Sequence, residues 1–180
     1  MSTHAPPSAA VRTIEQTRRR IDPARSTVEF QVPHFWGLKT VKGQFERYEG
    51  TLDLSAQPAV ELRIDAASLD TKRTARDKHL RSADFFDVEK HPQVRFESDH
   101  AELDGERLNV YGRLHAAGKK ITLDVAATLR PVADELELAA ATSADQRRLG
   151  MTWSPLGMIH APSALIIRGR LIPDDRTPRA

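Results

Sequence analysis

The sequence predicts an all-β fold in which about eight antiparallel strands form a sandwich or a closed barrel. Three observations lead to this prediction. Apolar and polar residues alternate along short segments, turn-forming residues separate these segments, and glycines recur at positions that would face the interior. Strict alternation is typical of antiparallel strands with one buried and one solvated face.

The alternating segments, in chain order, are residues 28–32, 41–45, 50–54, 60–64, 94–98, 108–114, 121–129, 136–138 and 165–171. In the first of them Val28, Phe30 and Val32 alternate with polar residues, and the others follow the same rule. Turn signals such as Asp104-Gly105 and Gly118-Lys119 fall between the segments. Many short strands joined by turns favour a sandwich or a barrel.

Glycines inside the alternating segments favour the barrel over the sandwich. Gly43, Gly112 and Gly169 occupy positions that would face inward. Glycine weakens a strand unless the strand bends or another group packs closely there, and sharp bending of long strands suits a barrel. The small inward residues, Gly50 and Ala127 included, also predict interior volume that neighbouring side chains leave unfilled.

One segment, residues 70–87, breaks the alternation and predicts a short helical insert. It contains many helix formers and includes the pair Phe85-Phe86 near its end. These aromatic side chains need a buried site, and we expect them to plug one end of the barrel. Asp77 and Asp84 are expected to cap the insert or to pair with Arg76 and Arg81.

Both ends of the chain lack the alternation. Residues 1–20 predict a flexible N-terminal arm, since the prolines at 6 and 7 resist helix and sheet. Residues 173–180 predict a polar C-terminal tail, so the barrel domain is expected over residues 21–172. Arg18–Arg20 would close the arm either as a solvated charge run or as a weak contact to an anionic membrane surface.

The composition excludes several classes of site and partner. The chain has 180 residues, no cysteine and a net charge of +2, which excludes a disulfide scaffold and a thiolate metal site and makes nucleic acid an unexpected partner. No apolar run approaches the ~18 residues of a membrane span, so stable membrane insertion is not expected. The first twenty residues lack the layout of a secretory signal, so we expect a cytoplasmic protein.

Signals for catalysis are weak. The seven histidines show no metal-ligand spacing, and nearly all carboxylates fall on the predicted solvent faces of strands. We therefore expect no catalytic residue, no metal and no cofactor. The rival hypothesis is a small hydrolase or metal-assisted catalyst that uses His34, His79 and Asp77.

Several motifs together resemble the YceI-like family. They are Ile21-Asp22-Pro23 followed by Ser26, Val28, Phe30 and His34; Val41–Phe45 with Gly50 and Leu52; Ser68–Thr71; Arg76–Leu80; Asp84–Asp87; Pro92, Phe96 and Ser98; and Gly112–Leu114 with Gly118. The resemblance implies a lipocalin-like, eight-stranded antiparallel barrel that holds a polyisoprenoid or other long-chain amphiphilic lipid, and it allows a homodimer. The chain departs from the family's late motif at Asp145–Gly150, where Gln146 stands in place of the usual arginine unless Arg147 serves instead, and where Leu149 replaces the aromatic residue before the glycine.

The expected ligand is such a lipid, held inside the barrel by apolar side chains. The expected lipid-binding residues are Phe30, Val32, Phe45, Leu62, Phe96, Val110, Leu123 and Val125, together with Trp153 and Met158 of an apolar lid over residues 150–160. A polar head group near one mouth is expected to contact His34, Arg76, His79 and Arg81. The protein would then carry, store or sense the lipid. The second rival is an interaction module with a solid core that acts in a stress response, which predicts no internal pocket.

Overall fold

The structure, a computed structural model, describes residues 18–34, 39–151 and 162–175. Its strands are β1 (Arg18–Ile21), β2 (Thr27–His34), β3 (Lys39–Phe45), β4 (Tyr48–Asp53), β5 (Ala59–Asp65), β6 (Leu69–Asp70), β7 (Gln93–Asp104), β8 (Arg107–Ala116), β9 (Lys119–Val132), β10 (Glu135–Ala144) and β11 (Ser163–Pro173). The helices are the α-helix α2 (Thr74–Arg81) and the 3-10 turns η1 (Pro23–Arg25), η2 (Ala66–Ser68) and η3 (Gln146–Leu149). The predicted all-β class with a short helical insert is confirmed.

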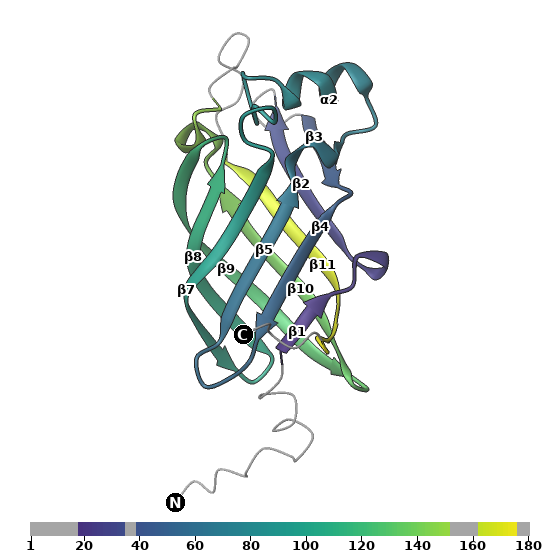
Figure 1. Cartoon of the computed structure of the whole chain (residues 1–180), viewed down its shortest axis with the longest axis vertical. Coiled ribbons are helices and arrows are strands. Elements are labelled where there is room, and N and C mark those ends of the chain that lie inside the picture. Colours follow the sequence, from purple (N-terminus) through teal and green to yellow (C-terminus); the bar gives the residue numbers. More distant parts are fainter. Residues whose placement is uncertain (1–17, 35–38, 152–161, 176–180) are drawn as a thin grey trace, which may run out of the picture.

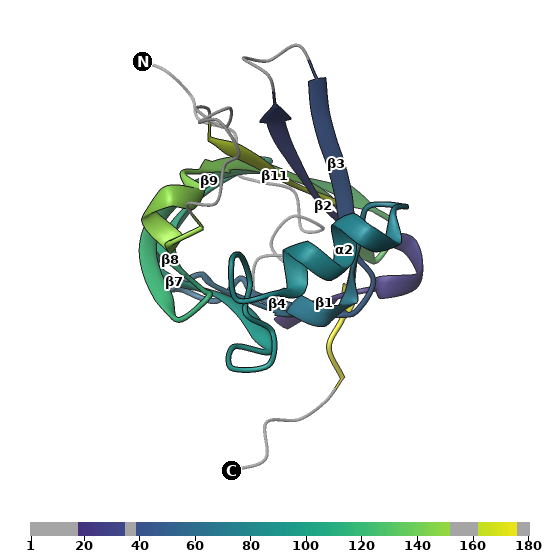
Figure 2. The same cartoon turned by 90° about the horizontal axis from the view of Figure 1, so that it is seen from above.

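Eight antiparallel strands close into a barrel, which decides between the two predicted architectures (Figure 1). They pair in the order β1, β4, β5, β7, β8, β9, β10 and β11, and β1 closes the ring by pairing with both β4 and β11. After η1 the chain continues as β2, which pairs with a second stretch of β11. Strands β3 and β6 extend the sheet from β2, and β2 and β3 project beside the ring in Figure 2.

The barrel begins earlier in the chain than expected, because Arg18–Arg20 belong to β1 and not to an N-terminal arm. Arg19 is only 4% exposed. Its guanidinium donates a hydrogen bond to the main-chain oxygen of Asp134, 115 residues further along the chain. Arg18 lies 3.5 Å from the carboxylate of Asp174, just beyond β11. Three consecutive arginines in a sequence do not reveal such partners, because Asp134 and Asp174 come close to them only when the barrel has formed.

Strand β7 is longer than the predicted segment 94–98 because a β-bulge interrupts the alternation. The pairing of β7 with β8 shifts register between Ser98 and His100, so one extra residue sits in β7. An extra residue moves every later side chain to the opposite face. Phe96 and Ala101 are therefore both buried, although an odd number of positions separates them and a regular strand would place them on opposite faces.

Phenylalanine rings and a serine fill the space above three inward glycines. A Cβ atom on Gly43 would lie 2.7 Å from Cε1 of Phe30, and one on Gly112 would lie 2.7 Å from Cζ of Phe96. A Cβ atom on Gly169 would collide with Ser26 in the same way. The prediction that these three glycines leave interior volume is wrong, because Phe30, Phe96 and Ser26 already occupy the space next to them.

We predict that Gly112→Ala destabilises the protein by about 2 kcal/mol, since overpacking a filled site forces side chains or strands apart. The new methyl group would collide both with the Phe96 ring and with the main-chain oxygen of Glu97. Gly50→Ala is the control, because its nearest neighbour, Leu62 Cδ1, would lie 3.3 Å away. Urea unfolding of both variants measures the difference, and equal losses would contradict the packing argument.

Candidate functional site

The barrel interior contains an apolar cavity of about 590 Å³, which lies within the size range of small-molecule sites. All eight barrel strands contribute to its wall, together with β2 and β3. Most of the wall is aliphatic or aromatic. A solidly packed interaction module, one of the two rival hypotheses, is therefore contradicted.

Large aliphatic side chains pack the end of the barrel where β1 closes the ring. Leu54, Leu129 and Leu136 are buried there and do not line the cavity. Leu136 is 1% exposed and lies in β10 just beyond the wall residue Leu138. We call this the closed end.

Helix α2 lies across the opposite end, which we call the mouth (Figures 1 and 2). It contributes Arg76, His79 and Leu80 to the cavity wall. The two phenylalanines that follow the helix also line the cavity. The ring of Phe86 meets Phe45 edge-on with centroids 5.9 Å apart, and the ring of Phe85 meets His79 at 5.2 Å. The predicted aromatic plug at one end of the barrel is thus confirmed.

A buried carboxyl group holds α2 against β6. Asp77 is 7% exposed. Its Oδ1 accepts hydrogen bonds from the main-chain N–H of Thr71 at 2.9 Å and from the Thr71 hydroxyl at 2.6 Å. Arg76 donates from Nε to the same hydroxyl at 2.8 Å and from Nη2 to the Thr71 carbonyl at 2.9 Å. These bonds fix the helix, and with it Arg76, at the edge of the cavity.

The expected pairing of Asp77 and Asp84 with Arg76 and Arg81 is wrong. Arg81 donates to two main-chain oxygens, of Ala67 at 2.9 Å and of Leu69 at 2.6 Å, and it does not line the cavity. Asp84 instead lies 3.3 Å from Nε2 of His79. Arg81 therefore ties α2 to η2 and β6, because the main-chain carbonyls of Ala67 and Leu69 need a hydrogen-bond donor.

Two half-buried carboxyl groups near the mouth have lowered pKa values. Hydrogen bonds from the Arg147 guanidinium, at 2.9 and 2.8 Å, hold the pKa of Asp145 below its usual range. The Lys72 ammonium lowers the pKa of Asp70 in the same way. Both carboxylates are ionised at neutral pH, so each compensates the charge of its partner.

Most of the predicted lipid-binding residues line the cavity. They are Phe30, Val32, Phe45, Leu62, Phe96, Leu123 and Val125. Val110 is 3% exposed and lies in the packed core, outside the wall. Trp153, Met158 and the side chain of His34 lie outside the described residues.

Sequence reasoning missed wall residues on β10 and β11. Leu138, Leu165 and Ile167 line the cavity, and the alternation of their segments already placed them inward. Ala140 also lines the cavity, but it lies in the apolar run Ala139–Ala141, which hides the alternation. Gln146 of η3 is a further wall residue and accepts a hydrogen bond from the Ser163 hydroxyl at 3.0 Å.

The rival catalytic arrangement finds no support in the geometry. Asp77 and His79 bond to different partners, Thr71 and Asp84. Across the described ranges, no three His, Asp or Glu side chains converge closely enough to bind a metal ion. No helix in the same part of the chain has the length and apolar character needed to cross a bilayer.

The chain is similar in sequence to a known domain family and to several bacterial proteins. The model of the YceI-like domain family matches residues 20–168. Protein YceI of Escherichia coli O6:H1 is 38% identical over 103 residues, and a UPF0312 protein of Serratia proteamaculans is 40% identical over 103 residues. Each alignment covers 54% of this chain and 53% of the relative, so the match spans about half the length of these curated relatives.

Solved structures share the barrel at low sequence identity. BcnA of Burkholderia cenocepacia superimposes with a TM-score of 0.76 and 19% identity, over 83% of this chain and 98% of that one. A polyisoprenoid binding domain from Saccharophagus degradans superimposes with a TM-score of 0.69 and 12% identity, over 88% of this chain and 99% of that one. At these identities the likeness establishes the shared fold.

Proposed function

The chain belongs to the YceI-like family, and on that premise we propose that its barrel binds a long-chain amphiphilic lipid, such as a polyisoprenoid, as a carrier or store. The observation that carries the proposal is the cavity of about 590 Å³ with a largely aliphatic and aromatic wall. The structural neighbour described as a polyisoprenoid binding domain supports it. The proposal makes the protein a binding protein rather than an enzyme and involves no metal or organic cofactor.

An apolar cavity favours such a ligand on energetic grounds. An empty space forfeits dispersion contacts along its wall, and an apolar chain restores them without leaving polar groups unpaired. At ~0.3 kcal/mol per heavy atom, a lipid of ~20–40 heavy atoms would gain roughly 6–12 kcal/mol. That range corresponds to dissociation constants from about tens of micromolar down to nanomolar.

Native mass spectrometry of the purified chain, followed by organic extraction, tests the proposal. We expect a bound species that organic solvent releases and that contains a long hydrocarbon chain. A chain that carries no lipid after purification and that also fails to bind a fluorescent fatty acid or a prenol would overturn it.

The head group is proposed to lie beside Arg76 and His79 at the mouth. Arg76 uses Nε and Nη2 to bond Thr71, which leaves Nη1 to meet an anionic oxygen. Arg76→Gln is expected to weaken binding of a prenyl pyrophosphate about fivefold, the equivalent of about 1 kcal/mol for one partly exposed charged hydrogen bond. Binding of the neutral prenol should change less than about twofold, and isothermal titration calorimetry measures both.

The control for this prediction is Arg107→Gln, which removes an exposed charge from the hairpin at the closed end. It should leave both affinities unchanged. Equal weakening of the pyrophosphate and the prenol by Arg76→Gln would show that Arg76 acts only through the packing of α2.

A further inference from the structure

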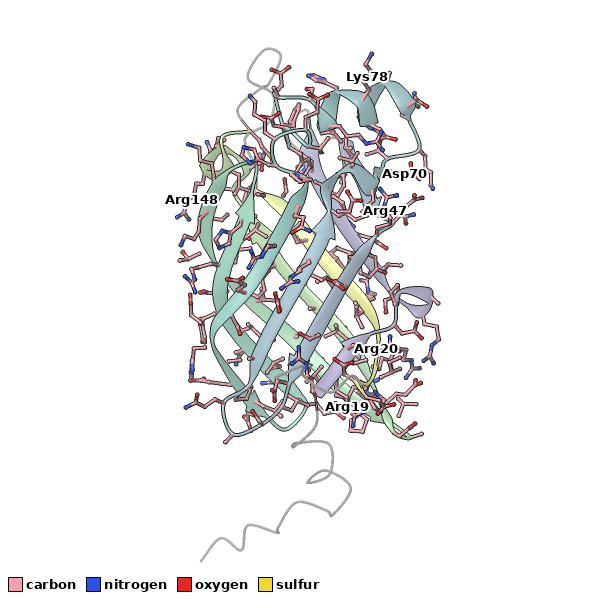
Figure 3. All side chains as sticks on the ribbon, in the orientation of Figure 1. Arg19, Arg20, Arg47, Asp70, Lys78 and Arg148 are labelled. Carbon is pink, nitrogen blue, oxygen red and sulfur yellow. The ribbon has the colours of Figure 1, made fainter. Side chains whose placement is uncertain are left out.

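Five exposed basic side chains surround the mouth, and we call them the mouth cations. They are Arg73, at the start of α2, and Lys78 within it, Lys119 and Lys120 at the start of β9, and Arg148 of η3. Figure 3 shows Lys78 and Arg148 at the same end of the barrel, projecting outward from α2 and η3. Figure 2 shows these two elements on opposite sides of the barrel opening.

The mouth cations form no close ion pair with a carboxylate among the described residues, and Arg148 acts on the Asp145 carboxyl group only at longer range. Other basic residues engage the nearby carboxylates: Arg47 pairs with Asp65 at 2.8 Å, Lys90 with Asp87 at 3.6 Å, and Arg147 and Lys72 with the carboxylates described above. Three exposed carboxylates at this end, Glu46, Asp84 and Glu89, have no lysine or arginine partner in the described part of the chain, against five cations.

The closed end is close to electrically balanced. Its turns and strand ends carry eight carboxylates and six arginines, which are Asp22, Asp53, Asp104, Glu106, Asp134, Glu135, Asp174 and Asp175 against Arg18, Arg19, Arg20, Arg25, Arg107 and Arg130. Several of the arginines there are paired with these carboxylates, as Arg25 is with Glu135 at 2.7 Å and Arg130 is with Glu106 at 3.8 Å. Basic side chains without a salt bridge are therefore more prominent around the opening of the apolar cavity than at the closed end.

We propose that the mouth cations dock this end of the barrel on an anionic lipid bilayer. Basic residues held near an anionic bilayer surface each strengthen binding about fivefold, and this attraction orients the molecule. Docking in this orientation would bring the mouth to the lipid head groups, where a long-chain ligand can pass between bilayer and cavity without crossing water. The exposed residues of α2 are Thr74, Ala75 and Lys78, so the helix presents no large apolar side chain to a bilayer. The contact is therefore electrostatic and needs no insertion. The inference goes beyond the ligand of the cavity, and its test does not require a loaded cavity.

Co-sedimentation of the full chain with lipid vesicles tests this proposal. Vesicles of phosphatidylglycerol and phosphatidylcholine are compared with vesicles of phosphatidylcholine alone at about 0.1 M salt, where surface charges still act over about 10 Å. We expect binding to the anionic vesicles only. The double variant Lys78→Glu/Arg148→Glu should weaken it at least about tenfold, since two attractive charges become repulsive.

The matched control is Arg107→Glu/Arg168→Glu, which makes the same change in net charge at exposed positions away from the mouth. It should bind anionic vesicles within about twofold of the unmodified chain, and both double variants should keep the unfolding midpoint of the parent. Binding to both kinds of vesicle alike, or equal losses in the two double variants, would overturn the proposal. So would vesicle binding that survives the mouth substitutions while binding to a DNA duplex is lost. A barrel that binds vesicles but no cavity ligand would uphold this inference while the proposed function fails.

Discussion

Replacing Ala140 by phenylalanine is expected to weaken lipid binding about twentyfold to thirtyfold while the barrel stays folded. Ala140 lies in β10, pairs with Ala127 of β9 and Ile167 of β11, and lines the cavity. The added ring would occupy space that about six ligand carbon atoms otherwise fill. At ~0.3 kcal/mol per atom this removes roughly 2 kcal/mol of binding free energy.

The measurement is displacement of a fluorescent fatty acid, together with the amount of lipid that co-purifies. Ala139→Phe is the matched control, because Ala139 is the preceding residue of the same strand and is exposed on the outer face. It should bind the probe as the parent does. Equal affinity of Ala140→Phe and Ala139→Phe would mean that the ligand does not occupy the cavity.

Replacing Asp77 by alanine is expected to lower the free energy of unfolding by about 2–4 kcal/mol. The substitution removes the acceptor of two hydrogen bonds and leaves the N–H group of Thr71 without a partner in a buried position. An unpaired buried donor costs its full desolvation in addition to the lost bonds. Because Arg76 bonds to the same threonine, the loss should also loosen the side of the mouth that α2 covers.

Urea unfolding measures the loss, and hydrogen exchange of the α2 amides reports where it occurs. Asp84→Ala is the control, since Asp84 is exposed and within the described ranges forms an ion pair only with His79. It should change the unfolding free energy by less than about 0.5 kcal/mol. Asp77→Asn retains an acceptor oxygen and should fall between the two. If Asp77→Ala costs no more than Asp84→Ala, the carboxyl group does not anchor the helix.

The alternation of side chains predicted strands well where nothing interrupted the pleat. Leu123, Val125 and Ala127 of β9 all line the cavity, as their spacing in the sequence indicated. The predicted strands end too early at the bulge after Ser98 and at the alanines of β10. In the first case an extra residue breaks the alternation, and in the second the uniform alanines hide it. Sequence reasoning missed β1 altogether, because Arg19 is buried only where the main-chain carbonyl of Asp134 is present to accept a hydrogen bond from its guanidinium.

The sequence by itself determined the strand pattern, the helical insert and the family, since each depends on neighbouring residues or on motifs that can be read along the chain. Only the tertiary structure decided where the interior is filled and where it is hollow. Phe30 and Phe96 fill the space above Gly43 and Gly112, whereas the wall around Ala127 and Ala140 remains open. It also decided that Arg76 reaches the cavity while Arg81 braces the main chain. The physical reason is that a cavity, like a buried hydrogen bond, depends on side chains from strands far apart in the sequence, and their positions are set only when the barrel closes.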